Sequence, residues 1–283
     1  MPKGPVEIPK LGAQSPDTHA HLDMLDDPAG ALERACLAGV TYIVTVDDPT
    51  EDPRGTLDSV DTWIDECRAR LEHWAVPHGE PPTIRVIVGV HPHNAKHWSD
   101  EVRATIVAET KDSRVAGIGE IGLDFHYDHS PREDQVAAFR AQLELAHELE
   151  LPVAVHLREA HDEGEAILRE IGVPAAGCVL HCFTGDAAMA ERFVEFGCHI
   201  SFAGPVTFAK SESLREAVAV VPLDRLLVET DCPFMAPEPL RGRVNEPSWA
   251  VFTTKRIAEV KELPTTQVAL AALGNAKRVF GGE

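Results

Sequence analysis

Eight short runs of apolar, mostly β-branched residues recur along the 283-residue chain, with helical stretches between them. Such runs are typical of buried strands, and strands that alternate with helices form parallel βαβ units. Eight units close naturally into a (β/α)8 barrel of the TIM type, and a doubly wound open sheet is the alternative. The expected strands span residues 17–21, 42–46, 85–91, 115–122, 152–157, 178–183, 199–204 and 226–231.

The clearest helix is expected to begin at Ser130, where SPRE supplies a capping serine, a proline at the first helical position and Glu133 three residues after the cap. No low-complexity linker interrupts the chain, which predicts a single barrel domain over residues 1–283 with a short N-terminal extension of about 15 residues. Further helical stretches cover roughly residues 55–74, 100–111, 161–171, 186–196, 211–220 and 246–278.

Composition narrows the classes of function. The chain has 26 basic and 46 acidic residues, a formal charge of −20, which opposes the broad basic surface of a protein that coats duplex DNA. A local phosphate site stays possible because charges beyond about 8 Å are largely screened at physiological salt. Six scattered cysteines without a CxxC pair, no signal peptide and no membrane-spanning run predict a reduced, cytoplasmic protein.

Polar residues with metal-binding chemistry stand at the carboxyl ends of five expected strands. His19 and His21 are two residues apart, so a strand directs both to one face. In a barrel, the strand ends meet at one mouth, where catalytic groups gather. The fourth, fifth, sixth and eighth strands contribute Glu120, His156, His181 and Asp231.

Four imidazoles and two carboxylates at one mouth indicate a metal centre, because an unpaired buried carboxylate is costly and imidazole is a common metal ligand. Each residue alone has a simpler explanation: a strand-end histidine is often a hydrogen-bonded core residue, and Glu120 alone fits a salt bridge. Together they predict two divalent cations, with Glu120 shared between them and open positions for water. Zinc, magnesium, manganese or iron suits these ligands.

Four further residues are candidates near this mouth. Glu229 shares a strand face with Asp231 and is a possible ion-pair partner of Arg158, which follows His156 by two residues. His91 and His93 end the third strand in GVHPH, where a role near the metal or substrate competes with a turn shaped by proline.

These motifs resemble the TatD family of metal-dependent deoxyribonucleases, within the amidohydrolase-like barrels. The resemblance runs from about residue 16 to the C-terminus, and it implies a hydrolase in which His19, His21 and Asp231 surround one ion while His156 and His181 surround the other. It also implies that Glu120 is shared. The motifs are DTHAHLD, GVHPH, GEIGLDF, LPVAVHLREA, VLHCFTG, ISFAGPVTF, LLVETDCPFMAPEPLRGRVNEP and NAKRVFG.

The sequence departs from the family pattern in two places. The second strand ends in VTVDD, where relatives usually read something like VGT, and a proline-rich insertion near HGEPPT precedes the third strand. Both are expected to reshape the mouth. Many related barrels bridge their metals with a carbamylated lysine, and Glu120 at the fourth strand favours the TatD branch instead.

The expected activity is deoxyribonuclease cleavage of phosphodiester bonds from single-stranded ends, by a metal-activated water. Asp231 is the expected proton acceptor beside Glu120, and Arg158 and Arg241 are candidates to hold phosphate oxygens; a surface ion pair is the simpler role for Arg241. Because the formal charge of −20 disfavours a long duplex, we expect single-stranded DNA or small phosphodiesters to be the preferred substrates. Two alternatives remain: a metal-dependent amide or ester hydrolase, and a non-catalytic metal-binding scaffold.

Overall fold

The computed structural model describes residues 6–74 and 78–282. Eight parallel strands form one sheet in sequence order, which confirms the barrel and excludes the doubly wound alternative. The strands are β1 (Ser15–Ala20), β2 (Val40–Asp47), β3 (Thr83–Val88), β4 (Val115–Asp124), β5 (Val153–Arg158), β6 (Cys178–Leu180), β7 (His199–Phe202) and β8 (Leu226–Val228).

The sheet closes on itself between β1 and the segment after β8. Asp231 donates its N–H to the carbonyl of His19 at 2.9 Å, and His21 donates to the carbonyl of Cys232 at 2.8 Å. The closure sets two expected site residues, His19 and Asp231, side by side. β1, β3, β6, β7 and β8 end earlier than expected. His21, His91, His93, His181 and Asp231 therefore follow their strands instead of ending them.

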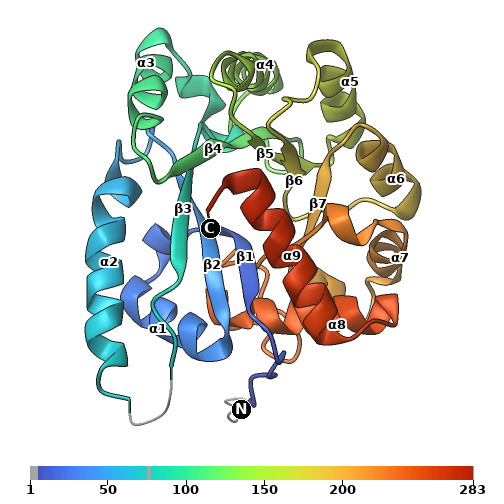
Figure 1. The fold of residues 1–283 in the computed structure, drawn as a ribbon. Helices are drawn as coiled ribbons and strands as arrows, with labels where there is room; N and C mark the ends of the chain where they lie inside the picture. Colours follow the sequence, from blue (N-terminus) through green and yellow to red (C-terminus); the bar gives the residue numbers. More distant parts are fainter. Residues whose placement is uncertain (1–5, 75–77, 283) are drawn as a thin grey trace.

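The helices surround the sheet, except for the last one (Figure 1). Apolar side chains on the outer faces of the strands pack against the surrounding helices in the larger core cluster. The helices are α1 (Pro28–Ala38), α2 (Gly55–Leu71), α3 (Asp100–Glu109), α4 (Arg132–Glu148), α5 (His161–Ile171), α6 (Ala187–Glu195), α7 (Glu212–Val220), α8 (Ala250–Lys261) and α9 (Thr265–Phe280).

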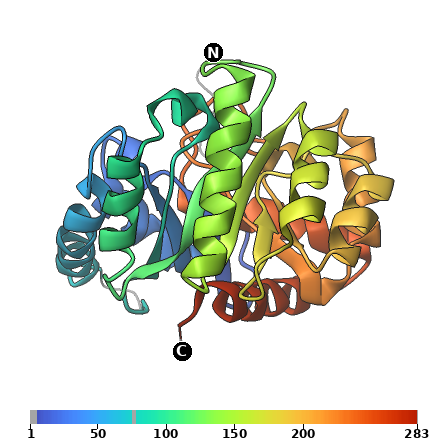
Figure 2. The same ribbon diagram turned by 90° about the horizontal axis from the view of Figure 1, so that it is seen from above.

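The helix α9 closes the amino-terminal end of the barrel. Its residues Leu273, Ala276, Val279 and Phe280 form a second apolar cluster with inward residues of the strands, among them Tyr42 at the start of β2. Tyr42 donates its hydroxyl to the carbonyl of Gly281 at 2.6 Å. Figure 2 shows α9 along the lower edge, where it covers the amino-terminal ends of the strands.

Two helix expectations are wrong. The stretch 246–278 is not one helix, because Glu262 adopts a left-handed backbone with φ of 55° and Pro264 starts a new helix. Ser130 does not cap α4, which begins at Arg132. Its hydroxyl instead donates to the carbonyl of His93 at 2.7 Å and accepts from the N–H of Lys96, so it ties two loops together at the mouth.

The first five residues of the expected N-terminal extension lie outside the described residues. Residues 6–14 contain no helix or strand, and Leu11 is buried in the core. No helix in the described part of the chain is long and apolar enough to span a membrane.

Candidate metal centre

Glu120 lies at the centre of the mouth, with the four expected imidazoles and that of His91 around its carboxylate. The oxygen Oε2 is 3.1 Å from Nε2 of His19 and 3.6 Å from Nε2 of His21. The other oxygen, Oε1, is 2.8 Å from Nδ1 of His156 and 2.7 Å from Nε2 of His181. Residues on or just after four separate strands therefore meet within hydrogen-bonding distance or just beyond it.

Asp231 completes the expected set of six. Its Oδ1 atom is 3.6 Å from Nε2 of His21, and its backbone is held by the barrel closure at His19. Glu120 is 2% exposed and Asp231 is 8% exposed, so both carboxylates are nearly removed from water. Both carboxylates lie 3.6 Å from Nε2 of His21, and buried carboxylates require positive charge or hydrogen-bond donors beside them.

Packing of β4 against β5 brings Glu120 this close to its neighbours. A Cβ atom on Gly119 would lie 2.9 Å from the Cβ of Ala154 and 3.1 Å from its carbonyl oxygen. The glycine before Glu120 therefore allows the backbones of the two strands to approach.

Three overlapping groups of side chains offer ligand atoms within 4.8 Å of one another: His19, His21 and Glu120; His19, His181 and Asp231; and His91, Glu120 and His156. The third group adds His91, whose Nε2 atom is 3.3 Å from Glu120. His91 therefore lies close enough to Glu120 to act as a ligand, and not only as a contact for substrate.

The donor atoms fit divalent cations. Nδ1 of His19 is buried without a hydrogen-bond partner among the described residues, although a neutral or charged imidazole normally has one. Burial raises the pKa of Glu120, but the imidazoles around it, His181 first, hold that pKa well below its usual range. Glu120 is therefore ionised, as a metal ligand would need to be. Burial lowers the pKa of His19, which favours its neutral form, the form in which imidazole binds metal.

Asp124, at the end of β4, is a site residue that the sequence reasoning missed. One of its oxygens lies 2.9 Å from Nε2 of His93 and 3.3 Å from Nε2 of His156. Burial raises the pKa of Asp124, but hydrogen bonds from His156, the Tyr127 N–H and His93 lower it far below its usual value. Its position four residues after Glu120 on the same strand was the available signal.

The sequence VTVDD does reach the mouth. The side chain of Asp48 accepts hydrogen bonds from the N–H of His91 at 3.0 Å and from the amide of Asn94 at 3.0 Å. It therefore fixes the segment that carries His91.

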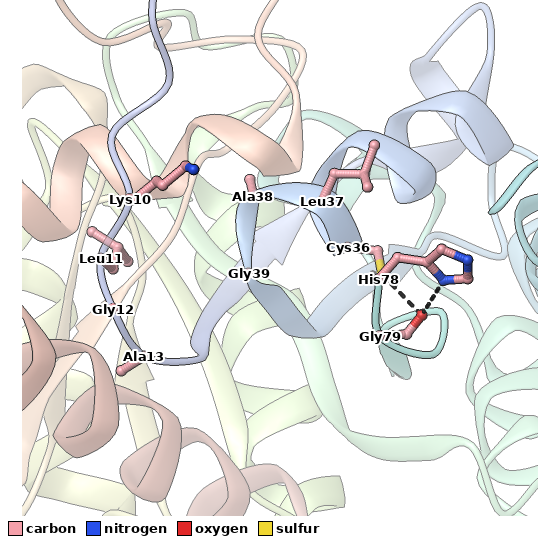
Figure 3. Close-up of a pocket in the computed structure, with 10 residues that line it drawn as sticks. All are labelled: Lys10, Leu11, Gly12, Ala13, Cys36, Leu37, Ala38, Gly39, His78 and Gly79. Carbon is pink, nitrogen blue, oxygen red and sulfur yellow. Dashed lines mark hydrogen bonds between the residues drawn. The ribbon is translucent and has the colours of Figure 1, made fainter. Parts of the chain in front are cut away.

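The HGEPPT segment does not reach the mouth, because it precedes β3 and so lies at the amino-terminal end of the strands. His78 and Gly79 line a cavity of about 430 Å³ there, together with Lys10–Ala13 and Cys36–Gly39 (Figure 3). Nδ1 of His78 and the thiol of Cys36 both contact the carbonyl of Gly79. The expectation that this insertion reshapes the mouth is wrong.

The suggested ion pair between Arg158 and Glu229 does not form. Glu229 accepts a hydrogen bond from the N–H of Cys182 and lies 3.4 Å from Nδ1 of His181. The guanidinium of Arg158 lies 4.6 Å from the centre of the Tyr127 ring instead. Strand parity fails here because β8 ends at Val228, before Glu229.

The other candidate substrate residues are more dispersed. His93 contacts Asp124 and the ring of His91, with 4.3 Å between ring centres. Arg241 lies in the loop after β8, with its guanidinium 4.4 Å from the centre of the Phe208 ring. Neither the position of Arg241 nor its ring partner could be read from the sequence.

Comparison with known proteins identifies the family. The chain is 38% identical over 269 residues to an uncharacterized metal-dependent hydrolase, YabD of Bacillus subtilis, covering 93% of this chain and 98% of the relative. It is 40% identical over 198 residues to the 3'-5' ssDNA/RNA exonuclease TatD of Erwinia amylovora, covering 68% and 76%. The crystal structure of YJJV, a TatD homologue from Escherichia coli, superimposes with a TM-score of 0.82 at 30% identity, covering 95% and 98%. The family described as TatD related DNase matches residues 16–281, and the chain belongs to this family of metal-dependent hydrolases.

Proposed function

We propose that this protein is a metal-dependent exonuclease that removes nucleotides from the 3' end of single-stranded DNA or RNA. The observation that carries the proposal is the convergence of five imidazoles on the buried carboxylate of Glu120. The named activity of the Erwinia relative supports the direction of cleavage and the kind of strand.

We propose that His19, His21, Glu120, His156, His181 and Asp231 hold two divalent cations, with His91 as a further donor beside Glu120. Zinc, magnesium and manganese all suit such mixed imidazole and carboxylate ligands. When bound, such a pair activates water and stabilises the charge that develops on a phosphate.

The remaining roles, proton transfer and the positioning of ligands, fall to side chains of the cluster. Asp231 lies at the edge of the cluster nearest His21 and accepts the proton of the attacking water. Glu120 holds the centre in place, and Asp124 orients His93 and His156.

Arg158 is the preferred phosphate-binding residue. It ends β5, two residues after His156, and makes no ion pair with any carboxylate of the described chain. An arginine at the mouth without a carboxylate partner is available to a phosphate. Arg241 is a weaker candidate because its guanidinium packs on Phe208. His93, beside Asp124, is a candidate to contact the substrate at the edge of the cluster, whereas His91 lies beside Glu120 as the further donor.

We propose that the chain acts as a single barrel domain, since the six proposed ligands all lie at one mouth of the eight-stranded sheet. We propose the cytoplasm as its compartment, because all six cysteines are free in the described structure, as expected for a reducing environment.

The test uses 3'-labelled and 5'-labelled single strands, long duplex DNA and an acyl ester in parallel. We expect cleavage of single strands from the 3' end, loss of activity with a chelator, and much slower cleavage of the duplex. Metal analysis of wild type and Glu120→Ala gives a readout independent of activity. Faster hydrolysis of the ester, or chelator-resistant cleavage that survives Glu120→Ala, would contradict the proposal.

A further inference from the structure

Two half-exposed aromatic rings stand at the mouth of the barrel, in the loops that follow β4 and β8. Tyr127 is 50% exposed and Phe234 is 51% exposed. Large apolar side chains gain by burial, so aromatic rings left exposed beside a buried polar site suggest a ligand that covers them.

Phe234 is held beside His21 by its backbone hydrogen bonds. Its N–H donates to the carbonyl of Asp231 at 2.9 Å, and its carbonyl accepts from the amide of Asn245 at 2.6 Å. Its ring meets that of His21 edge-on, with 6.1 Å between the centres. The backbone that positions Asp231 therefore also positions this ring.

Tyr127 is held near His156 and His93 through a hydrogen bond to Asp124. Its N–H donates to Oδ1 of Asp124 at 2.9 Å, while the other oxygen of Asp124 faces His93 and His156. The Tyr127 ring is parallel to that of His129, at 5.4 Å between centres and 6° between planes. Arg158 lies over the Tyr127 ring at 4.6 Å, so a cation stands beside this aromatic surface.

The two rings lie at opposite ends of one line of contacts. Phe234 touches His21, His21 lies beside Glu120, and Glu120 contacts His156, which shares Asp124 with the Tyr127 loop. A strand whose phosphate lies at Glu120 would therefore have Phe234 within reach past His21 and Tyr127 within reach past His156 and Asp124. The unpaired charge of Arg158 adds to this complementarity with a strand that carries a phosphate between two bases.

We propose that Phe234 and Tyr127 stack against the two bases that flank the scissile phosphate. This inference rests on the proposed nuclease function and adds the residues that select the strand. Every nucleobase offers a flat face to an aromatic ring, so stacking is tolerant of sequence. In a duplex these faces are covered by neighbouring bases, and the mouth therefore favours an unpaired end.

The experiment compares a single strand carrying ordinary bases with matched strands that have an abasic residue at the terminal or at the penultimate position. We expect the wild-type kcat/KM to fall roughly 5- to 150-fold when a stacked base is removed. Phe234→Leu should reduce this base preference toward 1 at one of the two positions, and Tyr127→Leu at the other. Phe234→Trp and Tyr127→Phe retain a flat ring and should keep the preference.

Trp74→Leu is the matched control, because Trp74 is an exposed aromatic beyond the end of α2, at the amino-terminal end of the barrel. It should leave the base preference unchanged, and a thermal melt checks that every variant folds. If the wild type cleaves single strands but Phe234→Leu and Tyr127→Leu keep the wild-type ratio, stacking is wrong and the nuclease proposal stands. If the wild type cleaves no strand, the proposed function itself fails.

Discussion

The two ends of the barrel use the same strands for opposite purposes. On β5, Ala154 belongs to the apolar cluster closed by α9, whereas His156, two residues further and on the same face, lies beside Glu120. On β6 and just after it, Val179 and His181 repeat this pattern. Apolar burial at the amino-terminal end stabilises the fold, which allows polar groups to be buried at the carboxyl end, where they are costly. Substitutions at the two ends should therefore separate activity from stability.

The largest expected effect is at the carboxyl end. Glu120→Gln keeps the shape of the side chain but removes its charge, and we expect kcat/KM to fall at least about 10³-fold, since several kcal/mol of stabilisation are lost. Bound metal, measured by elemental analysis, should fall with it. Glu195→Gln on the exposed side of α6 is the control and should change neither quantity. Full activity in Glu120→Gln would contradict the proposal that Glu120 is the shared metal ligand.

Phe280→Ala tests the amino-terminal end. Phe280 is 1% exposed in the cluster under the barrel. We expect the free energy of unfolding to fall by about 3–5 kcal/mol, because a large buried ring is lost and a cavity remains. Chemical denaturation measures this, and kcat/KM of the folded fraction should stay near the wild-type value. A large loss of activity without a loss of stability would break the separation between the two ends.

His199 is the first residue of β7, at the amino-terminal end of the barrel, and it should make the free energy of unfolding depend on pH. Burial, assisted by Arg225 and Arg278, lowers the pKa of His199 to about 4. The unfolded chain has a value of about 6.5, so between these two pH values the unfolded state binds a proton that the folded state excludes. The free energy of unfolding should therefore fall by about 2–3 kcal/mol as the pH decreases through this range.

The comparison of His199→Leu with wild type isolates this contribution from that of the other groups. Urea denaturation at several pH values should show a smaller loss of stability between pH 6.5 and 4 in the variant. Parallel pH dependence of the two proteins would show that His199 does not titrate in this way.

A smaller effect is expected for Asp124, which positions other residues. Asp124→Asn retains an oxygen for the Tyr127 N–H but weakens the contacts with His93 and His156. We expect metal affinity and kcat/KM each to fall by about 10- to 100-fold. Asp162→Asn, with a side chain 96% exposed, serves as the control. If kcat/KM falls while metal affinity is unchanged, Asp124 acts on the substrate and not through His156.

Much of the fold and the convergence of the six residues could be predicted from the sequence, because strand alternation and parallel topology force strand ends together. The failures share a physical cause. The SPRE pattern predicts a local cap at Ser130, but its partners, His93 and Lys96, lie in the 3-10 helix Pro92–His97 after β3. Glu229 was placed by parity beyond the end of β8, where the backbone no longer alternates. Asp124 could not be predicted, because its role depends on contacts with His93 and His156 that form only in the folded chain.

The central claim is that the mouth holds a pair of cations, and a crystal of the protein grown with zinc tests it most directly. An anomalous difference map should show two peaks beside Glu120, each within about 2.0–2.2 Å of imidazole nitrogens and carboxylate oxygens of the six residues. A map with no peak there, or with zinc bound only elsewhere on the surface, would contradict the account.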